Sequence, residues 1–217
     1  MKFFIDTANL DQIKEAQSLG ILDGVTTNPS LMAKEGITGQ ENIIAHYKAI
    51  CEIVEGDVSA EVIATDFEGM ISEGEALAAL HPQIVVKIPM MLAGITAIQY
   101  FADKRFKPHR PLVFSTGQAL LAAKAGATYV SLFIGRLEDV STDGLQLIED
   151  IRNVYDNYAF KTEILAASVR HTMHVIDCAH IGADVMTGPL SAIAGLAKHP
   201  LTDIGLAKFL ADYKKGN

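Results

Sequence analysis

Short runs of β-branched and aromatic residues recur along the chain at nearly regular intervals. Each run is followed by a longer stretch in which apolar residues return every three or four positions, as they do on one face of an α-helix. Near-continuous apolar strands that alternate with amphipathic helices are typical of a parallel sheet covered by helices on both faces. The eight predicted strands are residues 3–6, 22–26, 58–63, 84–88, 111–114, 129–134, 163–167 and 184–187.

Three of the intervening segments carry clear helical patterns. The first begins with a typical N-cap residue, Asn9, and continues with apolar residues at helical spacing. A further amphipathic segment, residues 199–213, follows the eighth strand, and a helix there must pack either on its own barrel or on a neighbouring subunit. The apolar positions of the first three segments are Leu10, Ile13, Ala16 and Leu19; Ile43, Ile44, Tyr47, Ile50 and Val54; and Leu145, Ile148, Ile151, Val154 and Tyr155.

Eight strand–helix units in 217 residues predict an α/β fold, a single-domain (β/α)8 TIM barrel with an additional C-terminal helix. A doubly wound open sheet is the alternative, but no Gly-x-Gly-x-x-Gly follows the first strand. No linker, charge block or low-complexity tract divides the chain. We therefore expect residues 1–217 to form one barrel domain.

The net charge of −8 disfavours nucleic acid or an anionic membrane surface as a partner. Cys51 and Cys178 fit neither a zinc spacing nor a disulfide framework, which favours two reduced thiols in a cytoplasmic protein. The longest charge-free stretch, residues 88–102, contains 15 residues including Pro89 and is too short to span a bilayer. The first residues reach a carboxylate, Asp6, too early for the apolar core of a signal peptide.

One lysine stands in an otherwise apolar predicted strand. Lys87 lies within Ile-Val-Val-Lys-Ile-Pro-Met, residues 84–90. Removing an unpaired ammonium group from water is costly, and such a group tends to lose its proton. Lys87 therefore either extends from the strand end to solvent or serves as an amine nucleophile.

In a (β/α)8 barrel, chemistry takes place where the strands end and the following loops begin. The alternation of side chains places Ser131 and Phe133 on one face, and Ser59, Glu61 and Ile63 on another. Helices cover the outside, so the polar faces point inward. The polar residues that we expect to converge at this end are Asp6, Asn28, Glu61, Lys87, Ser115, Ser131, Arg136, Ser168, Arg170 and Thr187.

Several of these residues also have ordinary structural explanations. Asp6 could cap the first helix, Asn28 could be a turn residue before Pro29, and Arg136 could be a solvated loop charge. A lysine beside carboxylates nevertheless suits Schiff-base aldol chemistry, in which the amine attacks a ketone and the carboxylates handle protons. Arg136 and Arg170 together would suit a phosphate. Isomerases and dehydratases on this fold remain compatible with the same residues.

Several segments resemble the transaldolase family, and in particular its small subfamily, which includes fructose-6-phosphate aldolase. The resemblance extends over nearly the whole chain and implies a (β/α)8 barrel, no cofactor and no metal. It also implies transfer or release of a three-carbon dihydroxyacetone unit in sugar-phosphate (pentose phosphate) metabolism. The matching segments are Phe4-Ile5-Asp6-Thr7-Ala8, Gly24-Val25-Thr26-Thr27-Asn28-Pro29-Ser30-Leu31, Val85-Val86-Lys87-Ile88-Pro89, Ala125-Gly126-Ala127-Thr128-Tyr129-Val130-Ser131 and His199-Pro200-Leu201-Thr202-Asp203.

The resemblance also implies a role for each candidate. By position in these motifs, Lys87 forms the Schiff base, Asp6 is the acid and base for the sugar hydroxyl, and Glu61 steers the catalytic water. The expected substrate-binding residues are Asn28 and Ser131 for the dihydroxyacetone part, Phe133 in the same pocket, and Arg136, Ser168 and Arg170 for the phosphate. Subfamily members often form pentamers or decamers, so the resemblance implies a homo-oligomer in which the C-terminal helix reaches a neighbour.

The chain departs from the family pattern at three places, one of which is the segment His171-Thr172-Met173-His174; the segment before it, Ser168-Val169-Arg170, is kept. Met91 stands where a hydroxyl residue is usual, and His109-Arg110-Pro111 replaces an Asn-x-Thr whose threonine helps to hold the catalytic water. Proline is tolerated at the first residue of a strand, so we expect Pro111 to begin the fifth strand without disturbing the barrel. The water would then depend on Glu61 and on His109 or Ser115, and turnover would be weak.

Two residues bear on the choice between transferase and lyase. The chain has Glu61 and Phe133 where fructose-6-phosphate aldolases prefer Gln and Tyr, which favours a transaldolase over an aldolase. A phospho-sugar-binding relative that has lost most of its turnover is a third reading. Finally, the spacing of His171, His174 and Cys178 would place them on one helical face, but the strict geometry of metal ligands and the lack of an obvious carboxylate argue against a metal site.

Overall fold

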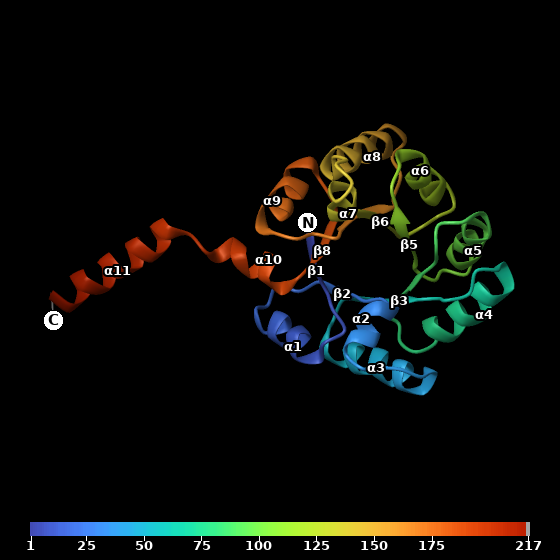
Figure 1. Ribbon diagram of the computed structural model, residues 1–217, viewed down its shortest axis with the longest axis horizontal. Coiled ribbons are helices and arrows are strands. Elements are labelled where there is room, and N and C mark those ends of the chain that lie inside the picture. The colour runs from blue at the N-terminus through green and yellow to red at the C-terminus, as the bar shows by residue number, and fades with distance from the viewer. Residues whose placement is uncertain (216–217) are drawn as a thin grey trace.

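The computed structural model describes residues 1–215 and has the predicted architecture, a closed barrel of eight parallel strands (Figure 1). Each strand pairs with the next along the chain, and β1 pairs with β8 to close the ring. The (β/α)8 prediction is therefore confirmed. The strands are β1 Lys2–Asp6, β2 Gly24–Thr26, β3 Asp57–Glu61, β4 Ile84–Lys87, β5 Pro108–Val113, β6 Tyr129–Phe133, β7 Glu163–Ala167 and β8 Val185–Gly188.

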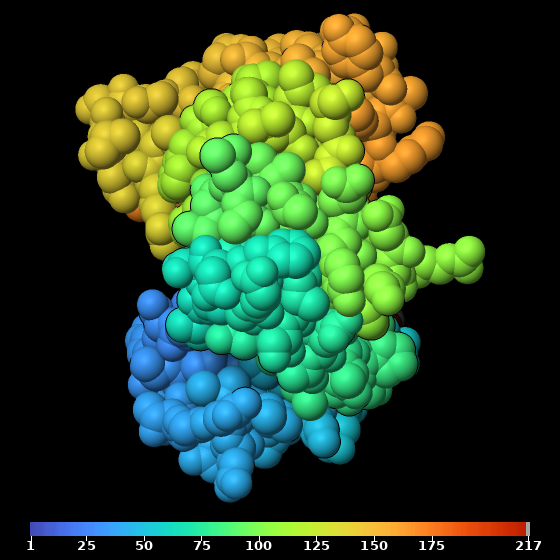
Figure 2. All heavy atoms as spheres, turned by 90° about the vertical axis from the view of Figure 1, so that its right-hand side faces the viewer, coloured from blue at the N-terminus to red at the C-terminus, as the bar shows by residue number. Residues whose placement is uncertain are grey.

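The helices surround the barrel, and the face seen in Figure 2 is built mainly by α4, α5 and α6. The predicted cap of the first helix is confirmed, because Asn9 Oδ1 accepts hydrogen bonds from the backbone N–H groups of Asp11 and Gln12. The helices are α1 Leu10–Ser18, α2 Pro29–Lys34, α3 Gln40–Ile53, α4 Phe67–Ala78, α5 Leu92–Asp103, α6 Thr116–Lys124, α7 Ile134–Glu138, α8 Gly144–Tyr158, α9 Thr172–Ile181, α10 Leu190–Ala194, the short 3₁₀ helix Gly195–Ala197 and α11 Pro200–Lys215.

The barrel interior is filled by side chains, and ion pairs lie at the amino-terminal end of the strands. Its apolar layer is formed by Phe4, Val85, Tyr129, Leu165, Ala167 and Val185. Below this layer, ion pairs join Lys2 to Glu163 at 2.8 Å and Lys107 to Asp57 at 2.6 Å. The opposite end, where the strands finish, is therefore the end that is open to a substrate.

The fifth strand differs from the prediction. It begins at Pro108, so Pro111 is its fourth residue and not its first. Arg110 pairs with Val130 and Val113 pairs with Leu132, so that Pro111 and Leu112 together face one residue of β6. This is a β-bulge, and Leu112 adopts a left-handed φ of 59° in it. A bulge tolerates proline because its residues are not required to donate to the ladder, and the barrel closes as expected.

The third strand also ends earlier than predicted. It stops at Glu61, and Ile63 is 67% exposed, so Ile63 does not share the inward face of Glu61 and Ser59. The backbone N–H of Ile63 instead donates to a carboxylate oxygen of Glu73 on α4. The chain therefore turns out of the barrel immediately after the Glu61 side chain has been placed inside it.

The predicted C-terminal helix is present as α11, which extends away from the barrel on its own (Figure 1). Its apolar residues lie in water, with Leu201, Ile204 and Phe209 each more than half exposed. An apolar helix surface of this kind marks an interaction site. Within residues 1–215, no helix has the length and apolar character needed to cross a membrane.

Candidate active site

Lys87 is the last residue of β4 and is buried, with only 5% of its surface exposed. Its Nζ lies 3.0 Å from Glu61 Oε2 and 3.1 Å from the backbone oxygen of Thr27. The register of β3 and β4 pairs Glu61 directly with Lys87, which explains why the two side chains meet. Lys87 therefore does not extend to solvent, and the buried ammonium group is stabilised by two acceptors.

Asp6 ends β1 and belongs to a directional chain of hydroxyl groups. Its Oδ1 accepts a hydrogen bond from Thr26 Oγ1 at 2.7 Å, and Thr26 Oγ1 lies 2.6 Å from Thr187 Oγ1. A hydroxyl has one hydrogen, so when Thr26 donates to Asp6, Thr187 must donate to Thr26. Asp6 does not cap the first helix, because Asn9 has that role.

The environment of Asp6 also changes its acidity. Burial raises the pKa of Asp6 above its usual value of 3.8, while the Thr26 hydrogen bond and the nearby charges of Lys87 and Arg136 act in the opposite direction. The charges of Lys87 and Arg136 therefore both act on Asp6. A carboxylate with a raised pKa is suited to exchanging protons with a substrate.

A cavity of about 200 Å³ opens at the carboxyl end of the strands. It brings together residues from the ends of five strands, β2 to β6, as predicted from the sequence. The Oδ1 atom of Asn28 caps α2 by accepting from the Leu31 N–H at 3.0 Å, which leaves its amide nitrogen to face a ligand. Among the residues that line the cavity are Asn28, Glu61, Lys87, Pro111, Phe133 and Arg136.

Arg136 lies in the first turn of α7, next to the cavity. Its guanidinium carbon is 4.6 Å from the centroid of the Phe133 ring, a cation–π contact that holds the side chain against the cavity wall. Arg136 is exposed, as a solvated charge would be, but it lies on α7 and not in a loop. Its positive charge is available near the mouth of the site.

Arg170 and Ser168 follow β7 and lie close to the start of α7. Gly135 makes this possible, because a Cβ atom there would come within 2.6 Å of Arg170 Nε. The Arg170 guanidinium makes two hydrogen bonds to Asp139, one of 2.6 Å from Nη1 to Oδ1. Asp139 was not predicted from the sequence as a partner of Arg170. The hydrogen bonds from Arg170 keep the pKa of the Asp139 carboxyl below its usual range.

Ser131 points into the barrel and makes a short hydrogen bond to Nε2 of His109. Both residues are almost completely buried. Ser115 is different, because its Oγ caps α6 by accepting from the Gln118 N–H at 3.2 Å. Of the two residues suggested for the water site, His109 lies inside the barrel next to Lys87, whereas Ser115 is used as a helix cap.

The histidines near β7 serve the local structure. His171 caps α9, and His174 Nε2 lies 3.0 Å from Glu138 Oε1. Burial raises the pKa of the Cys178 thiol to about 12, so the sulfur stays protonated. In residues 1–215, no group of three or more histidine, cysteine, aspartate or glutamate side chains is arranged to hold a metal ion.

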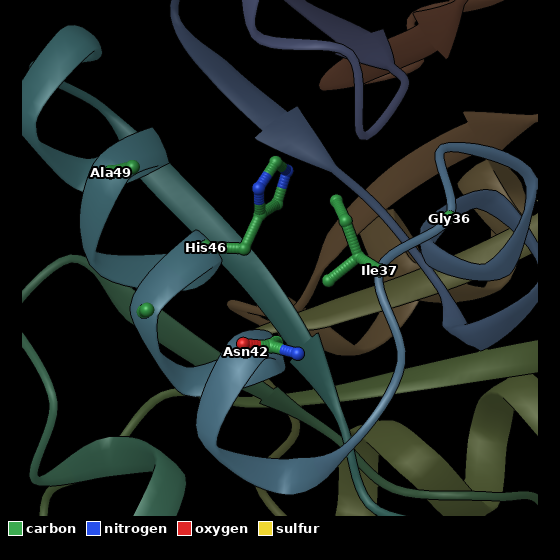
Figure 3. Close-up of a pocket in the computed structure, with 6 residues that line it drawn as sticks. Gly36, Ile37, Asn42, His46 and Ala49 are labelled. Atoms are coloured by element: carbon green, nitrogen blue, oxygen red, sulfur yellow. The ribbon is translucent and has the colours of Figure 1, made fainter.

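A second hollow, of about 340 Å³, lies outside the barrel between α3 and the loop that follows α2 (Figure 3). His46 points from α3 toward Gly36 and Ile37, and its Nε2 hydrogen-bonds the backbone oxygen of Ala8 at 2.6 Å. The lining residues are Gly36, Ile37, Asn42, Ala45, His46 and Ala49. This hollow has no lysine or carboxylate, so the chemistry belongs to the barrel cavity.

Comparison with known proteins identifies the family to which this chain is similar. The model of the family described as Transaldolase/Fructose-6-phosphate aldolase matches residues 3–215. A protein of Flavobacterium psychrophilum named probable transaldolase is 73% identical over the full length of both chains. Proteins of the same name from Cytophaga hutchinsonii and Parabacteroides distasonis are each 69% identical, again over the full length of both chains.

Proposed function

This chain belongs to the transaldolase/fructose-6-phosphate aldolase family, and from that premise we propose that it is a Schiff-base (class I) transaldolase. It transfers a dihydroxyacetone unit from a ketose phosphate to an aldose phosphate acceptor. The observation that carries this proposal is the 3.0 Å contact between Lys87 Nζ and Glu61 Oε2 in a cavity at the open end of the barrel.

The first half of the reaction begins at Lys87. Glu61 receives a proton from the ammonium group, directly or through a water, and the neutral amine attacks the ketone of the donor sugar. The carbinolamine loses water to give an iminium. Asp6 then takes the proton of the hydroxyl group on the leaving aldehyde, the neighbouring carbon–carbon bond breaks, and the electron pair moves to the iminium to form an enamine.

The second half reverses these steps with another aldehyde. The enamine carbon attacks the carbonyl of the acceptor, and Asp6 returns its proton to the new alkoxide. Water then hydrolyses the iminium, releases the ketose product and regenerates Lys87. We assign the dihydroxyacetone part to Asn28 and Ser131, on the basis of their positions in the family motifs.

The phosphate of the sugar is assigned to the cationic side of the cavity. Arg136 supplies one guanidinium group at the cavity wall, and Ser168 and Arg170 lie on the adjoining segment, packed against Gly135. Two arginines and a hydroxyl suit a phosphate dianion, which is best held by several charge-assisted donors. In a chain of net charge −8, this local concentration of positive charge is what an anionic substrate requires.

A lyase that releases the dihydroxyacetone unit is the second candidate, and Phe133 bears on it. Phe133 lines the cavity and has no hydroxyl, so it cannot protonate the enamine. An enamine that is not protonated persists until an acceptor aldehyde arrives, which favours transfer over release. Cleavage of fructose 6-phosphate measured with and without erythrose 4-phosphate separates the two, since a lyase releases glyceraldehyde 3-phosphate quickly without the acceptor.

The decisive experiment is chemical trapping. Incubation with fructose 6-phosphate or dihydroxyacetone, followed by borohydride, should leave a reduced adduct on Lys87, which peptide mass spectrometry locates. Lys87→Arg should fold, as judged by circular dichroism, but form no adduct, because a guanidinium stays protonated. A bound substrate beside an unmodified Lys87 would overturn the Schiff-base proposal.

The protein is further proposed to act in the cytoplasm as a homo-oligomer, a pentamer or decamer, in which α11 packs on a neighbouring subunit. The support is the exposure of Leu201, Phe209 and Leu210 on a helix that extends away from its own barrel. Burying these side chains would contribute about 25 cal/mol per Å² of apolar surface. Light scattering should give the mass of a ring, and removal of residues 199–217 should reduce it to the monomer.

A further inference from the structure

One imidazole lies inside the barrel directly beside the lysine. His109 is the second residue of β5, is 1% exposed, and pairs in register with Lys87 of β4. On its other side it pairs with Tyr129 of β6, and the two rings meet edge to face with centroids 5.8 Å apart. A polar ring at this depth is stable only with a hydrogen-bond partner.

That partner is Ser131, the next inward residue of β6 after Tyr129. His109 Nε2 and Ser131 Oγ form a short hydrogen bond, and Ser131 is itself buried. A serine hydroxyl can rotate to suit any neighbour unless one partner fixes it. The imidazole therefore determines whether the hydrogen or the lone pairs of the Ser131 hydroxyl face a substrate.

The direction of the hydrogen bond between His109 and Ser131 depends on which ring nitrogen carries a hydrogen. Burial, together with the positive charge of Lys87, lowers the pKa of His109 well below its usual value of 6.5, so the ring is neutral. With its hydrogen on Nε2, His109 donates to Ser131, whose own hydrogen is then free to point to the cavity. With its hydrogen on Nδ1, Ser131 must donate, and it offers only lone pairs to a substrate.

We propose that His109 is a positioning residue for the dihydroxyacetone part of the donor sugar. It acts through Ser131, whose hydroxyl it orients toward a hydroxyl group of the ketone bound at Lys87. This inference rests on the proposed function, and it adds a residue at which the chain departs from the family pattern. No proton exchange between His109 and the substrate is required.

The test is a double-mutant cycle between His109 and Ser131, read out on Lys87 adducts. The concentration of ketone that gives half-maximal borohydride-trapped adduct is measured for dihydroxyacetone and for acetone, which has no hydroxyl groups. His109→Leu and Ser131→Ala should each reduce the preference for dihydroxyacetone over acetone by roughly 10-fold, the loss expected for a buried, oriented hydrogen bond. The double variant should lose no more than either single variant, because both remove the same interaction.

A graded pair of substitutions keeps the test valid if His109→Leu does not fold. The amide nitrogen of Gln reaches about as far from the backbone as Nε2 of histidine, whereas the amide of Asn is one carbon shorter. His109→Gln should therefore retain most of the preference for dihydroxyacetone, and His109→Asn should lose it.

Three results would overturn the inference: multiplicative losses in the double variant, equal changes for both ketones, or an unchanged preference in His109→Leu. The first would mean that His109 acts independently of Ser131, and the second that it only supports the structure. If the unmutated protein forms no Lys87 adduct, the proposed function fails and this inference fails with it. An adduct combined with any of the three results removes the inference alone.

Discussion

Glu61 Oε2 and Lys87 Nζ lie 3.0 Å apart at paired positions of β3 and β4, and both side chains are largely buried. A carboxylate this close to a buried amine stabilises the charged form and is also positioned to receive its proton. Glu61 therefore both stabilises the buried lysine in the barrel and is placed to act as its base.

The first prediction concerns this pair. Glu61→Gln keeps the shape of the side chain and a hydrogen-bond acceptor, but removes the base and the partner charge. We expect kcat for transfer to fall by roughly 100-fold, the usual contribution of a positioned proton acceptor, while the protein remains folded. Glu75→Gln is the matched control, because that carboxylate lies on α4, away from the cavity, and accepts a hydrogen bond from the Tyr100 hydroxyl. Equal activities of the two variants would exclude Glu61 from the mechanism.

The second prediction is a change in pH dependence through Asp6. Asp6 must be ionised to accept a proton, and the Thr26 hydrogen bond lowers its pKa against the effect of burial. Thr26→Val removes that bond, so the pKa of Asp6 rises and the acidic limb of kcat/KM moves to higher pH. Thr187→Val acts one hydroxyl further away and should cause a smaller shift in the same direction. If the acidic limb of kcat/KM stays at the same pH in both variants, that limb reports the ionisation of a group other than Asp6.

Much of this arrangement could be predicted from the sequence, because the barrel is determined by local patterns. The strand ends follow from runs of apolar residues, and in a closed parallel barrel the ends of all strands meet. That argument alone brought Asp6, Glu61 and Lys87 together. In the structure Lys87 pairs with Glu61 at 3.0 Å, and the charges of both act on Asp6. Their catalytic roles remain predictions.

The fifth strand shows where the sequence pattern fails. Its first residues did not resemble a strand because His109 and Arg110 are polar, yet both are buried, His109 inside the barrel and Arg110 on the opposite face of β5. Arg110 donates to the backbone oxygen of Met91 at 3.0 Å and to Met90 Sδ at 2.8 Å. Burial lowers its pKa to about 10. Only the tertiary fold supplies these partners.

The link between Asp139 and Arg170 was missed for a related reason. The two residues are 31 positions apart, at the C-cap of α7 and after β7, and an exposed aspartate in a loop-rich segment gives no signal of a partner. The close approach depends on Gly135, whose missing side chain leaves room for Arg170. The reason for a glycine at position 135 can be recognised only when the position of the segment that follows β7 is known.

The third prediction follows from that ion pair. A substrate phosphate must share Arg170 with Asp139, and the two anions repel each other. Asp139→Asn removes the charge while keeping an acceptor, so the KM for a phosphorylated ketose should fall about 3- to 5-fold, the range expected for an exposed ion pair. Dihydroxyacetone, which has no phosphate, should bind as before. Asp103→Asn, the same change at the far end of α5, is the control. A KM that rises instead would mean that Asp139 is needed to hold Arg170 in place.

The fourth prediction concerns stability at Met91. Met91 is the N-cap of α5, with an extended backbone, and its side chain makes no capping hydrogen bond. Met91→Thr supplies a hydroxyl acceptor for the free N–H groups of the first turn and should raise the free energy of unfolding by about 1 kcal/mol. Met91→Val has the same shape without the hydroxyl and should gain nothing. Urea unfolding midpoints compare the two, and equal midpoints would show that the cap is not limiting.

The last prediction returns to Pro111, which lines the cavity beside Glu61 and Lys87. Proline has no hydroxyl to hold the catalytic water, and losing one positioned donor costs on the order of 100-fold in rate. We expect slow transfer by the unmutated protein, together with ordinary affinity for sugar phosphates in calorimetry. Because Pro111 sits in a bulge, its replacement breaks no ladder hydrogen bond, and stability should fall by only about 0.4–1 kcal/mol through the unfolded chain.

Pro111→Thr should therefore raise turnover, and Pro111→Val isolates the reason. Valine has the shape of threonine, and it restores the same backbone N–H and the same freedom of the unfolded chain, so it differs only in the missing hydroxyl. A gain in the threonine variant alone would assign the slow rate to the water site. Turnover that stays flat or falls in Pro111→Thr, or normal speed in the unmutated protein, would mean that Glu61 and His109 have rebuilt the water site without a residue-111 hydroxyl. The phospho-sugar-binding role would then lose its basis, because the cavity would hold every group that transfer needs.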